Sequence, residues 1–199
     1  KRHIFHYSPC GKLFRSSYII NYNFEFSVGE QLEDAPYGVM THMLADNIIV
    51  LDYIGYNYRK HESSIMGRMK KRDSSPLIPY KGIETAVKVV RRHKNDEHTD
   101  QILSYCIIKI LTGFTTYLFF NSNNTTRKQL CSYCYQFIEG FSLKIKNNPY
   151  FNILKLKKIP FHHRMAVKLF ILFYKMHLLY PFSYLTSRIY RLYIYISKK

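Results

Sequence analysis

The stretch GEQLEDAPY, residues 29–37, decides how the rest of the chain can be interpreted. Within it the adjacent carboxylates Glu33 and Asp34 precede a proline and an apolar run that is compatible with a helix. Proline is tolerated in the first turn of a helix, where an N–H would have no intrahelical partner. Asp34 is therefore predicted to lie at or next to the N-cap, where the helix dipole favours its ionised form. An oriented carboxylate suits a general base, although an ordinary helix cap has the same pattern.

A series of short motifs flanks this stretch. In chain order they are GKLFR (11–15), FEF (24–26), ADNIIVL (45–51), YNYR (56–59) and SSIM (63–66). Together they resemble the second half of the catalytic domain of bacterial family-2 glycosyltransferases. That half contains Lys-Leu-aromatic-Arg, a phenylalanine in a turn, Glu-Asp before a helix, an Ala-x-x-Ile strand and Tyr-x-Tyr-Arg before a serine. The resemblance covers about residues 8–66.

The resemblance implies an α/β fragment, the acceptor side of an A-type nucleotide-sugar transferase fold with helices on both faces of a mixed sheet. The apolar run 48–51 is too short for a helix and predicts a buried strand, and residues 55–59 are predicted to be its partner strand. The Asp-x-Asp metal motif of the family's nucleotide-binding half is not found in this sequence. We therefore expect the chain to be a fragment of a longer enzyme whose divalent ion, Mg²⁺ or Mn²⁺, is held mainly by the missing half. No cofactor is expected for the fragment itself, which is expected to be inactive alone.

The resemblance also assigns roles to residues. Asp34 would take the proton of an acceptor hydroxyl as it attacks the anomeric carbon of a nucleotide-diphosphate sugar, with inversion. Glu33 would shape the site or bond an acceptor hydroxyl. Further contacts with substrate are expected from Lys12, Tyr58, Arg59 and Ser63. The expected reaction transfers a sugar to a glycan or lipid-linked acceptor in cell-surface polysaccharide synthesis.

The positive charge lies after the region of resemblance. The net charge is +17, yet residues 1–66 contain six Lys/Arg and seven Asp/Glu, whereas residues 67–199 contain 24 and six. A surface of one sign indicates an anionic partner, such as a phospholipid surface, nucleic acid or phosphorylated glycolipid. Nucleic acid is not expected, because no fingerprint motif is present and the cations alternate with long apolar runs. A non-catalytic, basic, membrane-associated scaffold would explain residues 76–199 but not the motifs before them.

The domain organisation follows the change in sequence pattern. Residues 1–66 would belong to the catalytic domain, 67–75 to a polar linker, and 76–199 to a helical, membrane-associating extension. Helices are predicted over residues 12–22, 34–46, 79–94, 97–120 and 126–146, with Ile83, Val87 and Val90 on one face of the third. Residues 102–120 approach the length of about 20 that a membrane span needs, but Lys109 and several hydroxyl side chains favour a buried helix.

In the last segment of the chain, the positively charged side chains are predicted to lie on one side of a helix. In residues 161–180, Arg164, Lys168 and Lys175 fall within an arc of about 40° on a helical wheel. Pro181 is expected to end this run, and Arg188 and Arg191 continue the pattern. These five side chains are predicted to contact an anionic membrane, which places the protein on the cytoplasmic face of the cell membrane. A core helix with solvent-directed lysines would give the same pattern.

The cysteines do not predict a disulfide framework in a chain of this length. Cys131 and Cys134 have the spacing of a zinc or redox pair, but no second pair of ligands follows them. Their surroundings predict two buried thiols one helical turn apart.

Overall fold

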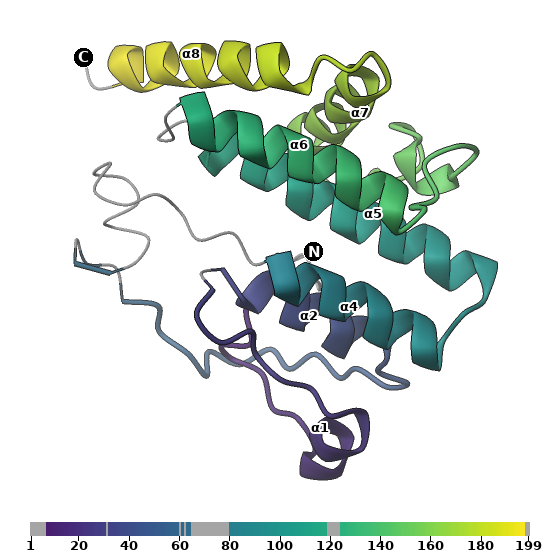
Figure 1. Cartoon of the computed structure of the whole chain (residues 1–199). Helices are drawn as coiled ribbons and strands as arrows, with labels where there is room; N and C mark the ends of the chain where they lie inside the picture. Colours follow the sequence, from purple (N-terminus) through teal and green to yellow (C-terminus); the bar gives the residue numbers. More distant parts are fainter. Residues whose placement is uncertain are drawn as a thin grey trace.

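The computed structural model describes residues 7–30, 32–59, 61, 63–64, 80–118 and 124–197. Within these ranges the chain is helical and contains no β-strand (Figure 1). The helices are α1 (Ser16–Tyr22), α2 (Asp34–Met43), α4 (Tyr80–His93), α5 (Glu97–Gly113), α6 (Asn124–Gly140), α7 (Phe161–Lys175) and α8 (Leu179–Ser197), with a π-helical turn η1 (Phe114–Leu118) and a 3-10 turn η2 (Pro149–Phe151). The predicted α/β fold is therefore wrong, and the predicted linker 67–75 lies outside the described residues.

The two predicted strands are the source of that error. Residues 47–59 form an irregular segment on the surface, and the side chains of Ile49 and Leu51 are 84% and 71% exposed. A strand is stabilised by backbone hydrogen bonds to a neighbouring strand. No such neighbour lies beside this segment in the described part of the chain. The apolar run that predicted a buried strand is consequently exposed.

Helix α2 begins at Asp34, as predicted, with Pro36 in its first turn. Its inner face is fully buried at Val39 and Leu44. Gly38 allows the N-terminal segment to cross this helix closely, because a Cβ there would lie 2.3 Å from the Tyr7 carbonyl oxygen. The crossing places the residues that follow Tyr7 next to α2.

Helix α4 packs against α2, and both pack against α5. The predicted inner face of α4 is confirmed, since Ile83, Val87 and Val90 have no exposed surface. The carboxylate of Glu30 accepts hydrogen bonds from the first turn of α4, from Lys81 N at 2.9 Å and Gly82 N at 3.0 Å. At the other end of α4, Lys94 Nζ donates to the Met43 carbonyl at 3.2 Å. These hydrogen bonds connect α4 to the segment before α2 and to the last residue of α2.

Helix α5 occupies the centre of the molecule, between the α2–α4 pair and the layer formed by α6 and α8 (Figure 1). Residues 103–108 are buried on every side, as expected for a helix surrounded by others. The Asp96 side chain accepts a hydrogen bond from Thr99 N at 2.9 Å and so caps its start. Arg91 Nε joins α4 to α5 through Asp100 Oδ1 at 2.8 Å.

None of the helices in the described ranges has both the length and the apolar character needed to cross a bilayer.

The C-terminal helices differ from the prediction at their ends. Helix α6 stops at Gly140, where Ser142 adopts a left-handed φ of 47°, and does not reach residue 146. Pro181 does not end the preceding helix. It lies in the first turn of α8, where proline is tolerated, and the break between α7 and α8 falls at His177 with a φ of 57°. The expectation that Pro181 breaks the run was wrong for that reason.

Candidate functional site

Asp34 and Glu33 lie at the start of α2. Glu33 is the N-cap residue, with helical backbone angles and no capping hydrogen bond from its side chain. Asp34 is the first helical residue and is half-buried. The carboxylate of Asp34 thus belongs to the first turn, where unpaired N–H groups favour negative charge.

Lys12 lies next to Asp34, as part of the loop that follows the crossing at Gly38. Its Nζ donates to the carbonyl oxygen of Ser8. Burial lowers the pKa of Lys12 below its ordinary value, whereas the negative charge of Asp34 opposes this shift. The structure thereby brings together two residues that the sequence analysis placed in one site. A half-buried ammonium beside a carboxylate is also suited to contact an anionic or hydroxylated ligand.

His42 extends this group along α2. It lies two turns after Asp34, and its Nδ1 is 2.6 Å from the Gly38 carbonyl oxygen. Burial lowers the pKa of His42 from its ordinary 6.5; the Gly38 carbonyl opposes the shift and the charge of Lys12 adds to it. Sequence reasoning missed His42, although its distance of eight residues from Asp34 on a predicted helix is a signal that could have found it.

Cys10 and Tyr56 complete the group. Hydrogen bonds with the side chains of Ser8 and Tyr56 lower the pKa of the exposed Cys10 thiol. The same contact raises the pKa of Tyr56, with a smaller contribution from Tyr58. Residues 56–58 therefore lie beside the loop that carries Lys12. We call Cys10, Lys12, Asp34, His42 and Tyr56 the Lys12–Asp34 cluster.

The remaining predicted residues are more dispersed. Arg59 lies at the exposed end of the segment 47–59. Ser63 lies in a short turn, where its Oγ is 2.7 Å from His61 Nδ1. Among the residues that the structure describes, no three His, Cys, Asp or Glu side chains are grouped in a way that could hold a metal ion.

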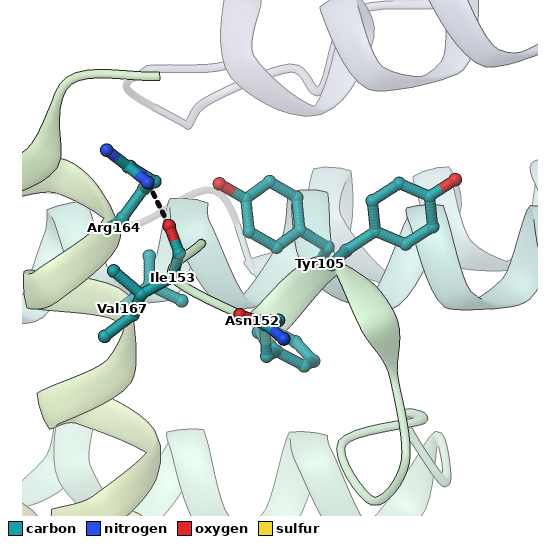
Figure 2. A pocket seen from close by; sticks show the side chains of 7 residues that line it. Tyr105, Asn152, Ile153, Arg164 and Val167 are labelled. Atoms are coloured by element: carbon teal, nitrogen blue, oxygen red, sulfur yellow. Dashed lines mark hydrogen bonds between the residues drawn. The ribbon is translucent and has the colours of Figure 1, made fainter. Parts of the chain in front are cut away.

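The predicted membrane-contacting cations have unequal surroundings. Arg164 Nη1 donates to the Ile153 carbonyl (Figure 2). Its guanidinium also lies 5.6 Å from the Phe161 ring centre, so Arg164 is fixed to the protein. Lys168 and Lys175 are exposed. Arg188 Nη2 donates to Tyr184 Oη at 2.6 Å. The side chain of Arg191 lies outside the described part of the chain.

A hollow between η2 and α7 is too small for a substrate site. Its cavity volume is about 10 Å³, and it is lined by Tyr105, Tyr150, Phe151, Asn152, Ile153, Arg164 and Val167 (Figure 2). Sites for small molecules usually occupy about 300–1,000 Å³. We therefore place the candidate functional site at the Lys12–Asp34 cluster.

Comparison of the chain with protein-family models, with curated proteins and with solved structures found no match.

Proposed function

We propose that the Lys12–Asp34 cluster is the acceptor side of a sugar-transfer site, with Asp34 as the general base. The observation that carries the proposal is the position of Asp34, in the first turn of α2 and beside the ammonium of Lys12. Both the helix N-terminus and a neighbouring cation favour the ionised carboxylate. An ionised Asp34 can accept a proton at neutral pH.

The order of motifs in residues 8–66 supports a nucleotide-diphosphate sugar as the donor class. In the proposed reaction, Asp34 removes the proton of an acceptor hydroxyl while the hydroxyl oxygen forms a bond to the anomeric carbon. The bond from that carbon to the diphosphate oxygen breaks, and the diphosphate leaves with the electron pair. Attack opposite the leaving group inverts the anomeric configuration.

The other residues would bind and orient. Lys12 would contact the diphosphate or an acceptor hydroxyl, and Glu33 would bond the acceptor. His42 is half-buried and its pKa is lowered, so a neutral imidazole beside Lys12 is favoured at neutral pH. In this proposal the acceptor is a glycan or a lipid-linked glycan.

Transfer of labelled sugar from uridine, guanosine and thymidine diphospho-sugars to membrane acceptors is measured for wild type and Asp34→Asn. Loss of a general base lowers turnover by about 10²–10⁴ with little change in donor binding. Asp46→Asn is the matched control, because Asp46 has the same chemistry, lies just after α2 and has an 81% exposed side chain. Near-normal turnover of Asp34→Asn, or equal losses in both variants, would remove Asp34 from the mechanism.

A further inference from the structure

The exposed face of α7 is unusually apolar for a surface helix. Phe161, Lys168, Leu172 and Lys175 are spaced i, i+7, i+11 and i+14, which places them within an arc of about 60°. Phe161 is 58% exposed and Leu172 is 49% exposed. Both lysines are also exposed. We call these four residues the α7 outer face.

The orientation of this face is fixed by the opposite side of the helix. Val167, Phe170 and Ile171 are buried and pack α7 against the rest of the helices. The apolar side chains of the outer face are therefore not needed in the core. The residue that follows α7, Met176, is 52% exposed and extends the apolar surface past the end of the helix. Exposed large apolar side chains that lie on one side of a surface helix, away from its core face, can mark an interaction site.

The two charged side chains of the outer face, Lys168 and Lys175, are both positive. In the sequence from 121 to 199 a single acidic residue, Glu139, accompanies 14 Lys and Arg residues. Glu139 belongs to α6, and its charge acts on Tyr174, which lies on a different side of α7 from the outer face. Within the described residues no ion pair involves Lys168 or Lys175. Their ammonium groups are consequently available to an anionic partner.

We infer that the α7 outer face docks on an anionic lipid bilayer. Phe161 and Leu172 would enter the boundary between headgroups and acyl chains, while Lys168 and Lys175 would contact lipid phosphates. Apolar side chains and cations within one arc match this boundary, where an apolar layer lies directly below a charged one. The inference rests on α7 alone and is independent of the proposed sugar transfer.

The middle of α8 has a similar composition. Leu185 and Ile189 are 54% and 58% exposed, and Arg188 lies between them in the sequence. This surface adds exposed apolar side chains and a cation of the same kind on the helix that follows α7 and contacts it.

A single tryptophan can report whether the outer face enters the bilayer, because the chain contains no tryptophan. Leu172→Trp in the 199-residue protein places the probe on the outer face. Ile20→Trp is the matched control on another helix, α1, where Ile20 is 73% exposed. We expect the Leu172→Trp emission to shift to the blue with vesicles that contain phosphatidylglycerol and not with pure phosphatidylcholine. The Ile20→Trp emission should stay unchanged with both.

The charge requirement is tested with paired glutamine variants in the Leu172→Trp background. Lys168→Gln with Lys175→Gln should lower the partition coefficient by about 30-fold, the factor for two cations near an anionic leaflet. Lys81→Gln with Lys88→Gln removes the same charge, at the same seven-residue spacing, from the exposed side of α4. This control should bind almost as well as the parent. Equal losses in both pairs, no loss in either, or no blue shift in the parent would each overturn the inference.

Discussion

Glu30 holds the first turn of α4 through Gly82, fifty-two residues later in the chain, with a hydrogen bond of 3.0 Å from Gly82 N to Glu30 Oε2. The other carboxylate oxygen accepts from Lys81 N. Because the N-terminal N–H groups of a helix have no partner within the helix, a carboxylate from elsewhere in the chain is well placed to satisfy them. The contact fixes the segment before α2 against α4.

Glu30→Ala should therefore destabilise the protein. Removing hydrogen bonds to a charged group costs about 1–3 kcal/mol in the free energy of unfolding. Urea denaturation followed by circular dichroism measures this change. Glu25→Ala is the control, because Glu25 is exposed in the same segment and should change stability by less than about 0.5 kcal/mol. Equal stability of the two variants would contradict the capping role of Glu30.

Gly82→Ala and Gly113→Ala should have opposite effects. Alanine is favoured over glycine in a helix by about 1 kcal/mol. At Gly82, however, a Cβ would lie 2.5 Å from Ser27 Oγ and 2.9 Å from Pro36 Cγ, so we expect a net loss of about 1–2 kcal/mol. At Gly113 a Cβ would meet no atom within 4 Å, so stability should rise by up to about 1 kcal/mol. Thermal unfolding measures both effects: the midpoint temperature should fall for Gly82→Ala and rise for Gly113→Ala.

Of the four thiols, one should react quickly with a disulfide reagent and three should react slowly. Cys10 is exposed and hydrogen bonds with Ser8 and Tyr56 lower its pKa. Burial raises the pKa of Cys106 and of Cys131 to about 11, and that of Cys134 well above its ordinary value. A disulfide reagent at mildly alkaline pH should modify one thiol quickly and the others only on unfolding.

Two variants assign the fast thiol. Cys10→Ser should abolish the fast phase, and Tyr56→Phe should slow it because the hydrogen bond to the thiolate is lost. A fast phase that persists in Cys10→Ser would show that one of the α5 or α6 thiols is accessible.

Protonation of His42 should destabilise the fold in mild acid. Its folded-state pKa lies below the ordinary 6.5, mainly because of burial. The unfolded chain therefore binds more protons below pH 6.5, and stability is full above that pH and declines as the pH falls toward the folded-state pKa. His42→Gln should flatten this part of the stability profile, measured by denaturation at a series of pH values.

The helices were predictable because their apolar residues repeat with the period of a helix. Ile83, Val87 and Val90 are buried as their spacing predicts, and Cys131 and Cys134 are buried thiols on one helix. The segment 48–51 was not predictable in the same way. An apolar run specifies a strand only when a neighbouring strand pairs with it, and that neighbour is not present among the described residues.

The candidate site was predicted in part. The motifs around Asp34 and Lys12 led to two residues that the structure brings together. His42 was missed although its spacing from Asp34 on the predicted helix could have found it, whereas the position of Cys10 depends on the crossing of Tyr7 over Gly38 and not on a local pattern. Arg59 and Ser63 remain predictions based on resemblance.

The exposure of residues 47–59 also makes them the natural point at which a protease would cut. Tyr53 is 79% exposed in irregular backbone, a conformation that chymotrypsin can accept, whereas the helices protect their backbone. A nick there would not release the N-terminal piece, because Glu30 still binds α4 and Lys94 still binds Met43. The cut protein should migrate as two bands under denaturing conditions and as one particle in native gel filtration. The covalent link at this point is thus dispensable for the assembled fold, and the two pieces would form a natural split-protein pair.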